Sequence, residues 1–166
     1  KIKGIDTCIK IAETIRSKYD DINFIVAGDG SLRKFVEDAH EKGIVRFLGF
    51  VPHNELARLY AESHVVVLPS REEAFGLVKL EAQASGTPVI ATDIPAFRQT
   101  VINGVTGFLV KPYTPEAFVE AIMRVRDMWI NHRDRYMEMV VNARRNAEQY
   151  CWERVVDVLL RKLLNT

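Results

Sequence analysis

Short apolar runs alternate with amphipathic stretches along most of this chain. Between Ile5 and Tyr19 the apolar residues recur at helical spacing, as they do over Leu32–Lys42 and from Pro52 to about Glu62. Compact apolar segments between and after these helices predict strands; they are Ile22–Ala27, Val45–Leu48, His64–Leu68, Pro88–Ala91 and Phe108–Val110. The remaining predicted helices are Gly76–Ser85, a short helix or turn over Ile94–Ile102, Pro115–Met128, about Arg133–Gln149, and Trp152–Leu164.

This alternation of strands and helices predicts an α/β fold with a doubly wound, Rossmann-like parallel sheet. Because His64–Leu68 is continuously apolar, we expect this strand to be buried on both faces. Ligands of such sheets bind beyond the carboxyl ends of the strands. The loops that carry the unusual residues follow three of the strands, at positions 28–30, 69–76 and 92–95. We therefore expect these loops to form the binding edge.

Composition and charge limit the classes of protein to which this chain can belong. With 166 residues, 48% of them hydrophobic and 27% charged, the chain fits one globular domain. A formal net charge of +1 gives no reason to expect a nucleic-acid partner. Because Cys8 and Cys151 are the only cysteines, neither a metal cluster nor a disulfide framework is expected. No apolar run approaches the roughly 20 residues of a membrane-spanning helix, and we expect a cytoplasmic location.

The strongest chemical signal is the segment from Glu73 to Glu81, in which seven residues separate two carboxylates. Gly76 and Leu77 open the predicted helix, so their backbone N–H groups lack intrahelical partners and suit a phosphate. The side chain of Glu81 leans back toward the helix start, which places one carboxylate on each side of these amides. We expect one carboxylate to hold a ribose and the other a hexose, with a diphosphate between them. Two unrelated surface glutamates are the alternative.

The stretch from Ile22 to Val110 resembles the C-terminal domain of glycosyltransferase family 4, which has the GT-B fold. The matching segments are Val26-Ala27-Gly28-Asp29-Gly30, residues 45–51 (VRFLGFV), Pro69-Ser70 with the two-glutamate motif, residues 81–90 (EAQASGTPVI) and residues 103–110 (NGVTGFLV). Residues 3–6 (KGID) are similar to the family's segment before its first helix here, and residues 152–156 (WERVV) to its closing helix, which crosses back to the other half.

The resemblance implies that residues 1–166 form one nucleotide-sugar-binding domain. It also implies that an acceptor-binding N-terminal domain and the first strand of this sheet belong to the same protein outside this sequence. The absence of an initiator Met at Lys1 leads to the same expectation of a longer protein. The implied reaction is the retaining transfer of a hexose from a UDP-, GDP- or ADP-linked donor to a glycan, lipid or small molecule. No metal ion or other cofactor is implied.

The resemblance also implies roles for individual residues. Lys3 would bind the donor diphosphate and stabilise the leaving group, Glu73 would hold the transferred sugar, and both would be catalytic. Glu81 would hold the ribose. The full set of donor-binding residues that it implies is Lys3, Gly28, Phe50, Val51, Glu73, Phe75, Gly76, Leu77 and Glu81. The alternatives are a plain surface position for Lys3 and core packing for Phe50 and Val51.

One loop differs from the family pattern, and for this reason other functions are also considered. Many relatives carry Gly-Gly-x-x-Glu where this chain reads Thr92–Gln99, so contacts to the sugar from this loop are not carried over. Arg98 in this loop fits a surface arginine better than a phosphate ligand. A sugar-nucleotide epimerase domain and a non-catalytic nucleotide-sugar-binding module are the alternative functions. The slightly basic tail, Arg124–Thr166, fits a solvated helix face, or else contact with the missing domain or the inner face of a membrane.

Overall fold

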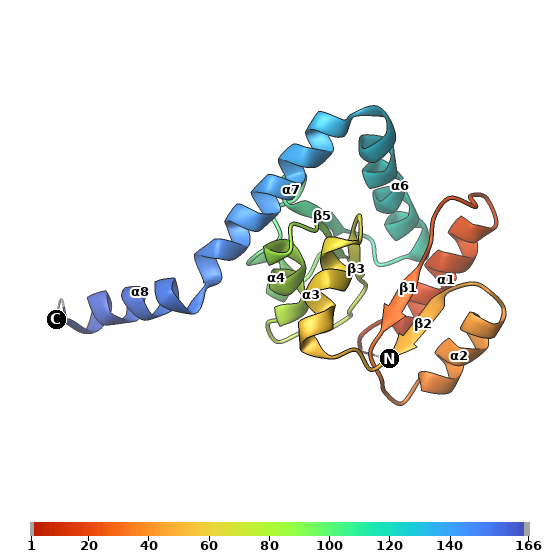
Figure 1. Cartoon of the computed structure of the whole chain (residues 1–166), viewed down its shortest axis with the longest axis horizontal. Helices are drawn as coiled ribbons and strands as arrows, with labels where there is room; N and C mark the ends of the chain where they lie inside the picture. The colour runs from red at the N-terminus through yellow and green to blue at the C-terminus, as the bar shows by residue number, and fades with distance from the viewer. Residues whose placement is uncertain (1, 165–166) are drawn as a thin grey trace.

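The structure is a computed structural model that describes residues 2–164, with the side chains of Val155 and Val158 outside the description. The ends of the predicted domain, residues 1 and 166, therefore lie outside the described residues. Strands and helices alternate through the first two thirds of the chain, and helices follow (Figure 1). In order, the elements are α1 (Ile5–Arg16), β1 (Ile25–Ala27), α2 (Arg33–Glu41), β2 (Arg46–Gly49), α3 (His53–Ala61), β3 (Val66–Leu68), α4 (Leu77–Ala84), β4 (Val89–Thr92), α5 (Pro95–Arg98), β5 (Gly107–Val110), α6 (Pro115–Asn131), α7 (Arg133–Ala147), the 3₁₀ turn η1 (Glu148–Tyr150) and α8 (Trp152–Leu164).

All strand pairs are parallel, which confirms the predicted α/β class, but the strands form two sheets rather than one. β1 pairs with β2, and β3, β4 and β5 form a second sheet in that order. Between β1 and β3 the described chain contains no hydrogen-bonded ladder. Helix α1 connects the two sheets instead, because Ile9 and Ala12 pack in the core beside β1 and β2, whereas Ile11 and Ile15 pack with Ile90 of β4.

The most deeply buried strand is β4, and the expectation that His64–Leu68 would be buried on both faces was wrong. Every residue of β4 is buried, whereas Val66, Val67 and Leu68 of β3 are half-buried. The sheet order explains the difference, since β4 lies between two strands and β3 is an edge strand. An apolar run alone does not reveal which strand will be central.

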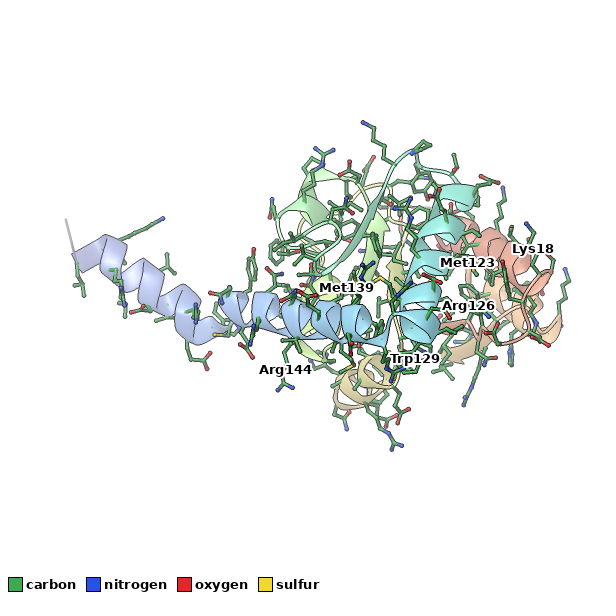
Figure 2. The ribbon with its side chains drawn as sticks, turned by 90° about the horizontal axis from the view of Figure 1, so that it is seen from above. Lys18, Met123, Arg126, Trp129, Met139 and Arg144 are labelled. Carbon is green, nitrogen blue, oxygen red and sulfur yellow. The ribbon has the colours of Figure 1, made fainter. Side chains whose placement is uncertain are left out.

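Helix α6 packs on β4 and β5, and α7 packs on α4. Phe118, Ile122 and Val125 of α6 are buried in the core with Ile11 and Ile15 of α1. Figure 2 shows Met139 and Arg144 on opposite sides of α7, and Met139 is buried whereas the Arg144 side chain is exposed.

Helix α8 leads away from the body of the molecule (Figure 1). Its large apolar side chains are exposed on the described chain; they are Trp152, Val156, Leu159, Leu160, Leu163 and Leu164. A helix with this much exposed apolar surface is typical of an element that packs on something else.

We predict that Gly107→Ala destabilises the fold strongly. Gly107 has φ 153°, and a Cβ atom there would lie 1.9 Å from the carbonyl oxygen of Val89 in the neighbouring strand. Backbone atoms of a central strand cannot retreat easily, so we expect a loss of about 3 kcal/mol in the free energy of unfolding, measured by urea denaturation. Gly30→Ala is the matched control, because a Cβ atom at Gly30 meets nothing within 4 Å. Equal stability of both variants would contradict this account.

Candidate functional site

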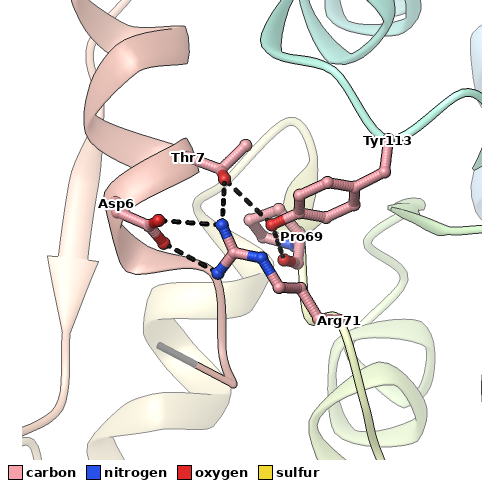
Figure 3. A network of polar contacts seen from close by, with 5 residues as sticks. All are labelled: Asp6, Thr7, Pro69, Arg71 and Tyr113. Carbon is pink, nitrogen blue, oxygen red and sulfur yellow. Dashed lines mark hydrogen bonds and ion pairs between the residues drawn. The ribbon is translucent and has the colours of Figure 1, made fainter.

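The segment before α1 is bound to the loop between β3 and α4, residues 69–76. The Arg71 amide donates to the Ile2 carbonyl at 2.8 Å, and the Arg71 guanidinium donates to both carboxylate oxygens of Asp6, at 3.0 and 2.8 Å (Figure 3). Hydrogen bonds from Arg71 are the main reason that the pKa of Asp6 lies below its usual value. Two segments that are 65 residues apart in sequence are thereby joined.

Tyr113, in the loop between β5 and α6, contacts both of these segments (Figure 3). Its hydroxyl donates to the Pro69 carbonyl at 2.8 Å and lies 2.9 Å from the Thr7 hydroxyl. Because a tyrosine hydroxyl has only one proton, Thr7 is the donor in the second contact. Gly4 fits against the same carbonyl: it has φ 68°, and a Cβ atom there would lie 1.8 Å from the Pro69 oxygen. Only glycine is compatible with this close approach.

These contacts place Lys3 against Glu73, the first carboxylate of the two-glutamate motif. The Lys3 ammonium forms an ion pair with Glu73 Oε2. The Lys3 side chain is 70% exposed, whereas that of Glu73 is 15% exposed, so the carboxylate is the better fixed partner. The Glu73 side chain also packs over Gly76, where a Cβ atom would lie 2.8 Å from Glu73 Cγ. The sequence-predicted residues Lys3, Glu73 and Gly76 therefore lie together.

The start of α4 presents free amides beside this ion pair. Gly76 has φ 74° and caps the helix without a side-chain hydrogen bond. In the described chain, the amides of Gly76 and Leu77 donate to no backbone carbonyl or side chain. Leu77 itself is exposed. Such an uncapped helix start carries partial positive charge and suits an anion.

The second carboxylate, Glu81, makes a different contact. Glu81 accepts a hydrogen bond from the Tyr60 hydroxyl of α3 at 3.2 Å, and burial, followed by the charge of Glu81, raises the pKa of Tyr60 to about 12. Tyr60 is held in turn by Thr87, whose hydroxyl donates to the Tyr60 carbonyl at 2.6 Å. Glu73 thus points to Lys3 and Glu81 to Tyr60. A cavity of about 340 Å³ adjoins the Arg71 network, but its lining, Ile2, Asp6, Arg71 and Glu72, includes neither glutamate.

The remaining predicted donor-binding residues follow β1 and β2. The Gly28 amide donates to the Gly49 carbonyl at 2.7 Å, and the space above its α-carbon is open. Phe50 is 75% exposed, so the alternative of core packing does not explain it, whereas Val51 is half-buried. Arg98 pairs with Asp93 at 2.5 Å, as fits a surface arginine.

Sequence reasoning missed Lys79, which lies inside the two-glutamate motif. Lys79 is 0% exposed, and its ammonium donates to the Phe75 carbonyl and lies 3.8 Å from the centroid of the Phe75 ring. Burial lowers the pKa of Lys79 to about 8. The signal was helical spacing: Lys79 shares a face with Ala82 and Gln83, which are buried. Asp6, Tyr60, Arg71 and Tyr113 were also missed, since their pairing depends on the tertiary fold.

No group of three or more His, Cys, Asp or Glu side chains is arranged to hold a metal ion among residues 2–164. Over the same residues, no helix has both the length and the apolar character needed to cross a membrane.

Comparison with known proteins identifies the family. A model of the family described as "Glycosyl transferases group 1" matches residues 1–146. The D-inositol 3-phosphate glycosyltransferase of Corynebacterium urealyticum is 36% identical over 171 residues, which cover 96% of this chain and 39% of that protein. An uncharacterised glycosyltransferase of Methanocaldococcus jannaschii is 33% identical, over 92% of this chain and 39% of that protein. This chain therefore spans about two fifths of the length of these relatives.

Solved structures agree with this assignment. Sucrose-phosphate synthase from Thermosynechococcus elongatus matches 99% of this chain and 43% of its own, with a TM-score of 0.79 and 28% identity. S. aureus TarM, solved with UDP, alpha-GlcNAc-glycerol and fondaparinux, matches 97% of this chain and 33% of its own, with a TM-score of 0.82 and 25% identity. The chain belongs to the group 1 glycosyl transferases and has the Rossmann-like fold of a GT-B half, as the sequence predicted.

We predict that Asp6→Asn weakens the connection between the first segment and the β3–α4 loop in a pH-dependent way. Because the pKa of Asp6 is lowered in the folded protein, its charge stabilises the fold above pH 3.8, and this stabilisation is lost as the pH falls through the folded pKa. At pH 7 we expect Asp6→Asn to lower the free energy of unfolding by about 0.5–1 kcal/mol, and the difference to shrink in acid. Urea unfolding at several pH values measures it.

The control for this experiment is Glu13→Gln, on the same helix. Glu13 is exposed and forms no ion pair within the described chain. This variant should match the wild type at every pH. A pH-independent loss in Asp6→Asn would show that the carboxylate charge is not the stabilising feature.

Proposed function

We propose that this chain is the donor-binding half of a glycosyltransferase that moves a hexose from a nucleotide diphosphate sugar to an acceptor with retention at the anomeric carbon. The observation that carries the proposal is the position of Lys3 and Glu73 beside the free amides that open α4. Lys3 supplies one positive charge, the helix start supplies aligned N–H donors, and Glu73 supplies an acceptor for sugar hydroxyls. These are the three chemical features that a sugar diphosphate requires.

The donor diphosphate would lie across the amides of Phe75, Gly76 and Leu77. As the glycosidic bond breaks, negative charge grows on the leaving diphosphate, and a fixed cation stabilises this state more than the bound donor. Lys3 fills this role, because it is exposed and can turn from Glu73 to a phosphate oxygen. Glu73 then becomes free to accept hydrogen bonds from the transferred sugar.

The nucleoside would bind beside Glu81, the second carboxylate of the motif, and beside the ends of β1 and β2. Tyr60 holds Glu81 in place, so that its second oxygen can accept from the ribose hydroxyls. The open face of Gly28 and the exposed ring of Phe50, with Val51, suit a flat base. Complexes of S. aureus TarM and of Anabaena HepE with UDP support a nucleotide as the ligand. UDP, GDP and ADP remain the candidates.

The rest of the enzyme would come from an N-terminal domain that binds the acceptor, a glycan, a lipid or a small molecule. The exposed apolar side chains of α8 suit packing on that domain, since so much apolar surface is unfavourable in water. We place the protein in the cytoplasm. If α8 packs on the N-terminal domain, this helix is not available to bind a membrane. Contact of the protein with the inner face of the membrane would then depend on a lipid acceptor.

We predict that the chain binds UDP, GDP or ADP and that Glu81→Ala weakens the preferred nucleotide about tenfold. The loss follows from removing hydrogen bonds between a carboxylate and the ribose hydroxyls. Isothermal titration calorimetry measures the dissociation constant. Glu41→Ala is the control, because Glu41 is an exposed glutamate of α2 with no ion pair in the described chain. No heat with any of the three nucleotides would overturn the proposed function.

We also predict that the full-length protein transfers the sugar without a divalent cation. Lys3 and the α4 amides supply positive charge at the diphosphate, which is the role that a metal ion has in other transferases. Product formation should therefore be the same with and without EDTA, and Lys3→Met should reduce it by about a hundredfold, as for loss of one transition-state contact. Isomerisation of the donor in place of transfer would identify an epimerase, and binding without either reaction a non-catalytic module.

A further inference from the structure

Lys79 is a buried cation that the proposed mechanism does not use. Its side chain is 0% exposed and runs back toward the start of α4, where the ammonium donates to the Phe75 carbonyl. The ring centroid of Phe75 lies 3.8 Å from Nζ and that of Phe97 lies 5.8 Å away. Lysine is almost never buried completely without a charged partner. The described chain provides no carboxylate in an ion pair with Lys79.

The position of this ammonium is unfavourable in two independent ways. Burial removes the water that stabilises a charge. The start of a helix already carries partial positive charge, so a second positive charge there is repelled. Aromatic faces and one carbonyl offset only part of these costs. A methionine of similar length would avoid both, which means that the fold alone does not explain a lysine at this position.

The charged groups around Lys79 are engaged with other partners. Glu73, from the β3–α4 loop, acts on Lys79 through its charge but forms its ion pair with Lys3. On α4 itself, Glu81 accepts from Tyr60 of α3. Beside α5, Asp93 pairs with Arg98. From α7, the neutral Asn146 amide contacts Gln83, so this helix adds no charge at that contact. An anion at the helix start would therefore meet a positive charge that is not yet neutralised.

We propose that Lys79 is a built-in counter-charge for the donor diphosphate, and that its protonated form sets the affinity for nucleotide. This inference rests on the proposed function, because it takes the start of α4 as the diphosphate site. The buried Lys79 ammonium contacts the carbonyl of Phe75, the residue directly before Gly76. It is therefore close to the free amides of Gly76 and Leu77, and its electric field adds to theirs without direct exposure to solvent. Because it acts from below the binding surface, Lys79 is a positioning and electrostatic residue rather than a catalytic one.

Nucleotide binding at this site would be coupled to the uptake of a proton by Lys79. With its pKa lowered to about 8, Lys79 is partly deprotonated in the free protein in mildly alkaline solution. A bound diphosphate favours the charged form and raises the pKa, so nucleotide binding takes up a proton between the two pKa values. Affinity is then highest below pH 8 and falls as the pH rises. The second ionisation of a phosphate, near pH 6, is about nine-tenths complete at pH 7, and it raises rather than lowers the affinity as the pH rises.

The test measures UDP, GDP and ADP binding by calorimetry from pH 7 to pH 9, below the range in which the bases and ordinary lysines titrate, in pairs of buffers with different ionisation enthalpies. For the preferred nucleotide, we expect the wild type to lose about fivefold in affinity over this range and to take up a fraction of a proton near pH 8.5. Lys79→Met should bind about tenfold more weakly at pH 7, with no change up to pH 9 and no proton uptake. Lys42→Met, which removes an exposed lysine, is the matched control and should behave as the wild type.

Thermal unfolding separates an electrostatic role from a structural one. If Lys79 serves binding, Lys79→Met should unfold at the same or a higher temperature, because a buried charge has been removed. A lower unfolding temperature together with weaker, still pH-dependent binding would assign a structural role and overturn the inference. Binding by the wild type without proton uptake would overturn it as well, and this measurement needs no variant. Absence of binding to any nucleotide would instead refute the proposed function.

Discussion

The candidate site depends on one close contact, the packing of Gly4 on the carbonyl of Pro69. Any side chain at Gly4 would overlap this carbonyl, and the same oxygen accepts the hydroxyl of Tyr113. The contact fixes the first segment of the chain against the loop that leads into α4. Arg71 strengthens it by binding the Ile2 carbonyl and the Asp6 carboxylate. Lys3 is exposed and long, so without this anchoring it would have no reason to lie at Glu73.

The order of the elements could be predicted from the sequence because it depends on local patterns. Helical spacing and turn residues located α6, α7 and α8 within a few residues, and apolar runs located every strand. The two-glutamate motif could be located as well, since a glycine at a helix start is a local signal. The two separate sheets and the central place of β4 were not predictable, because strand order is decided by tertiary packing rather than by the strand itself.

The site residues also differ in whether a local sequence pattern reveals them. Glu73, Gly76 and Glu81 lie within nine positions of one another, so the pattern reveals them. Asp6 and Arg71 are 65 positions apart and Tyr60 and Glu81 are 21 apart, so neither pair has a sequence signature. Lys79 is a different case. Its spacing placed it on the buried face of α4, but a lysine is ordinarily assigned to the surface on its chemistry alone.

Under the proposed function, the start of α4 binds an anion, and this arrangement has some cost to the stability of the free protein. Gly76 adopts a backbone conformation with positive φ, its amide and that of Leu77 have no partner in the described chain, and Lys79 carries a charge into the core. The buried charge of Lys79 is unfavourable in the free protein, whereas glycine adopts the positive φ without strain. A bound diphosphate would offset the charge and give the two amides hydrogen-bond partners. Local departures from the rules of stable folding are expected where binding compensates for them. Their concentration within four residues of one helix start is the strongest physical reason to place the donor there.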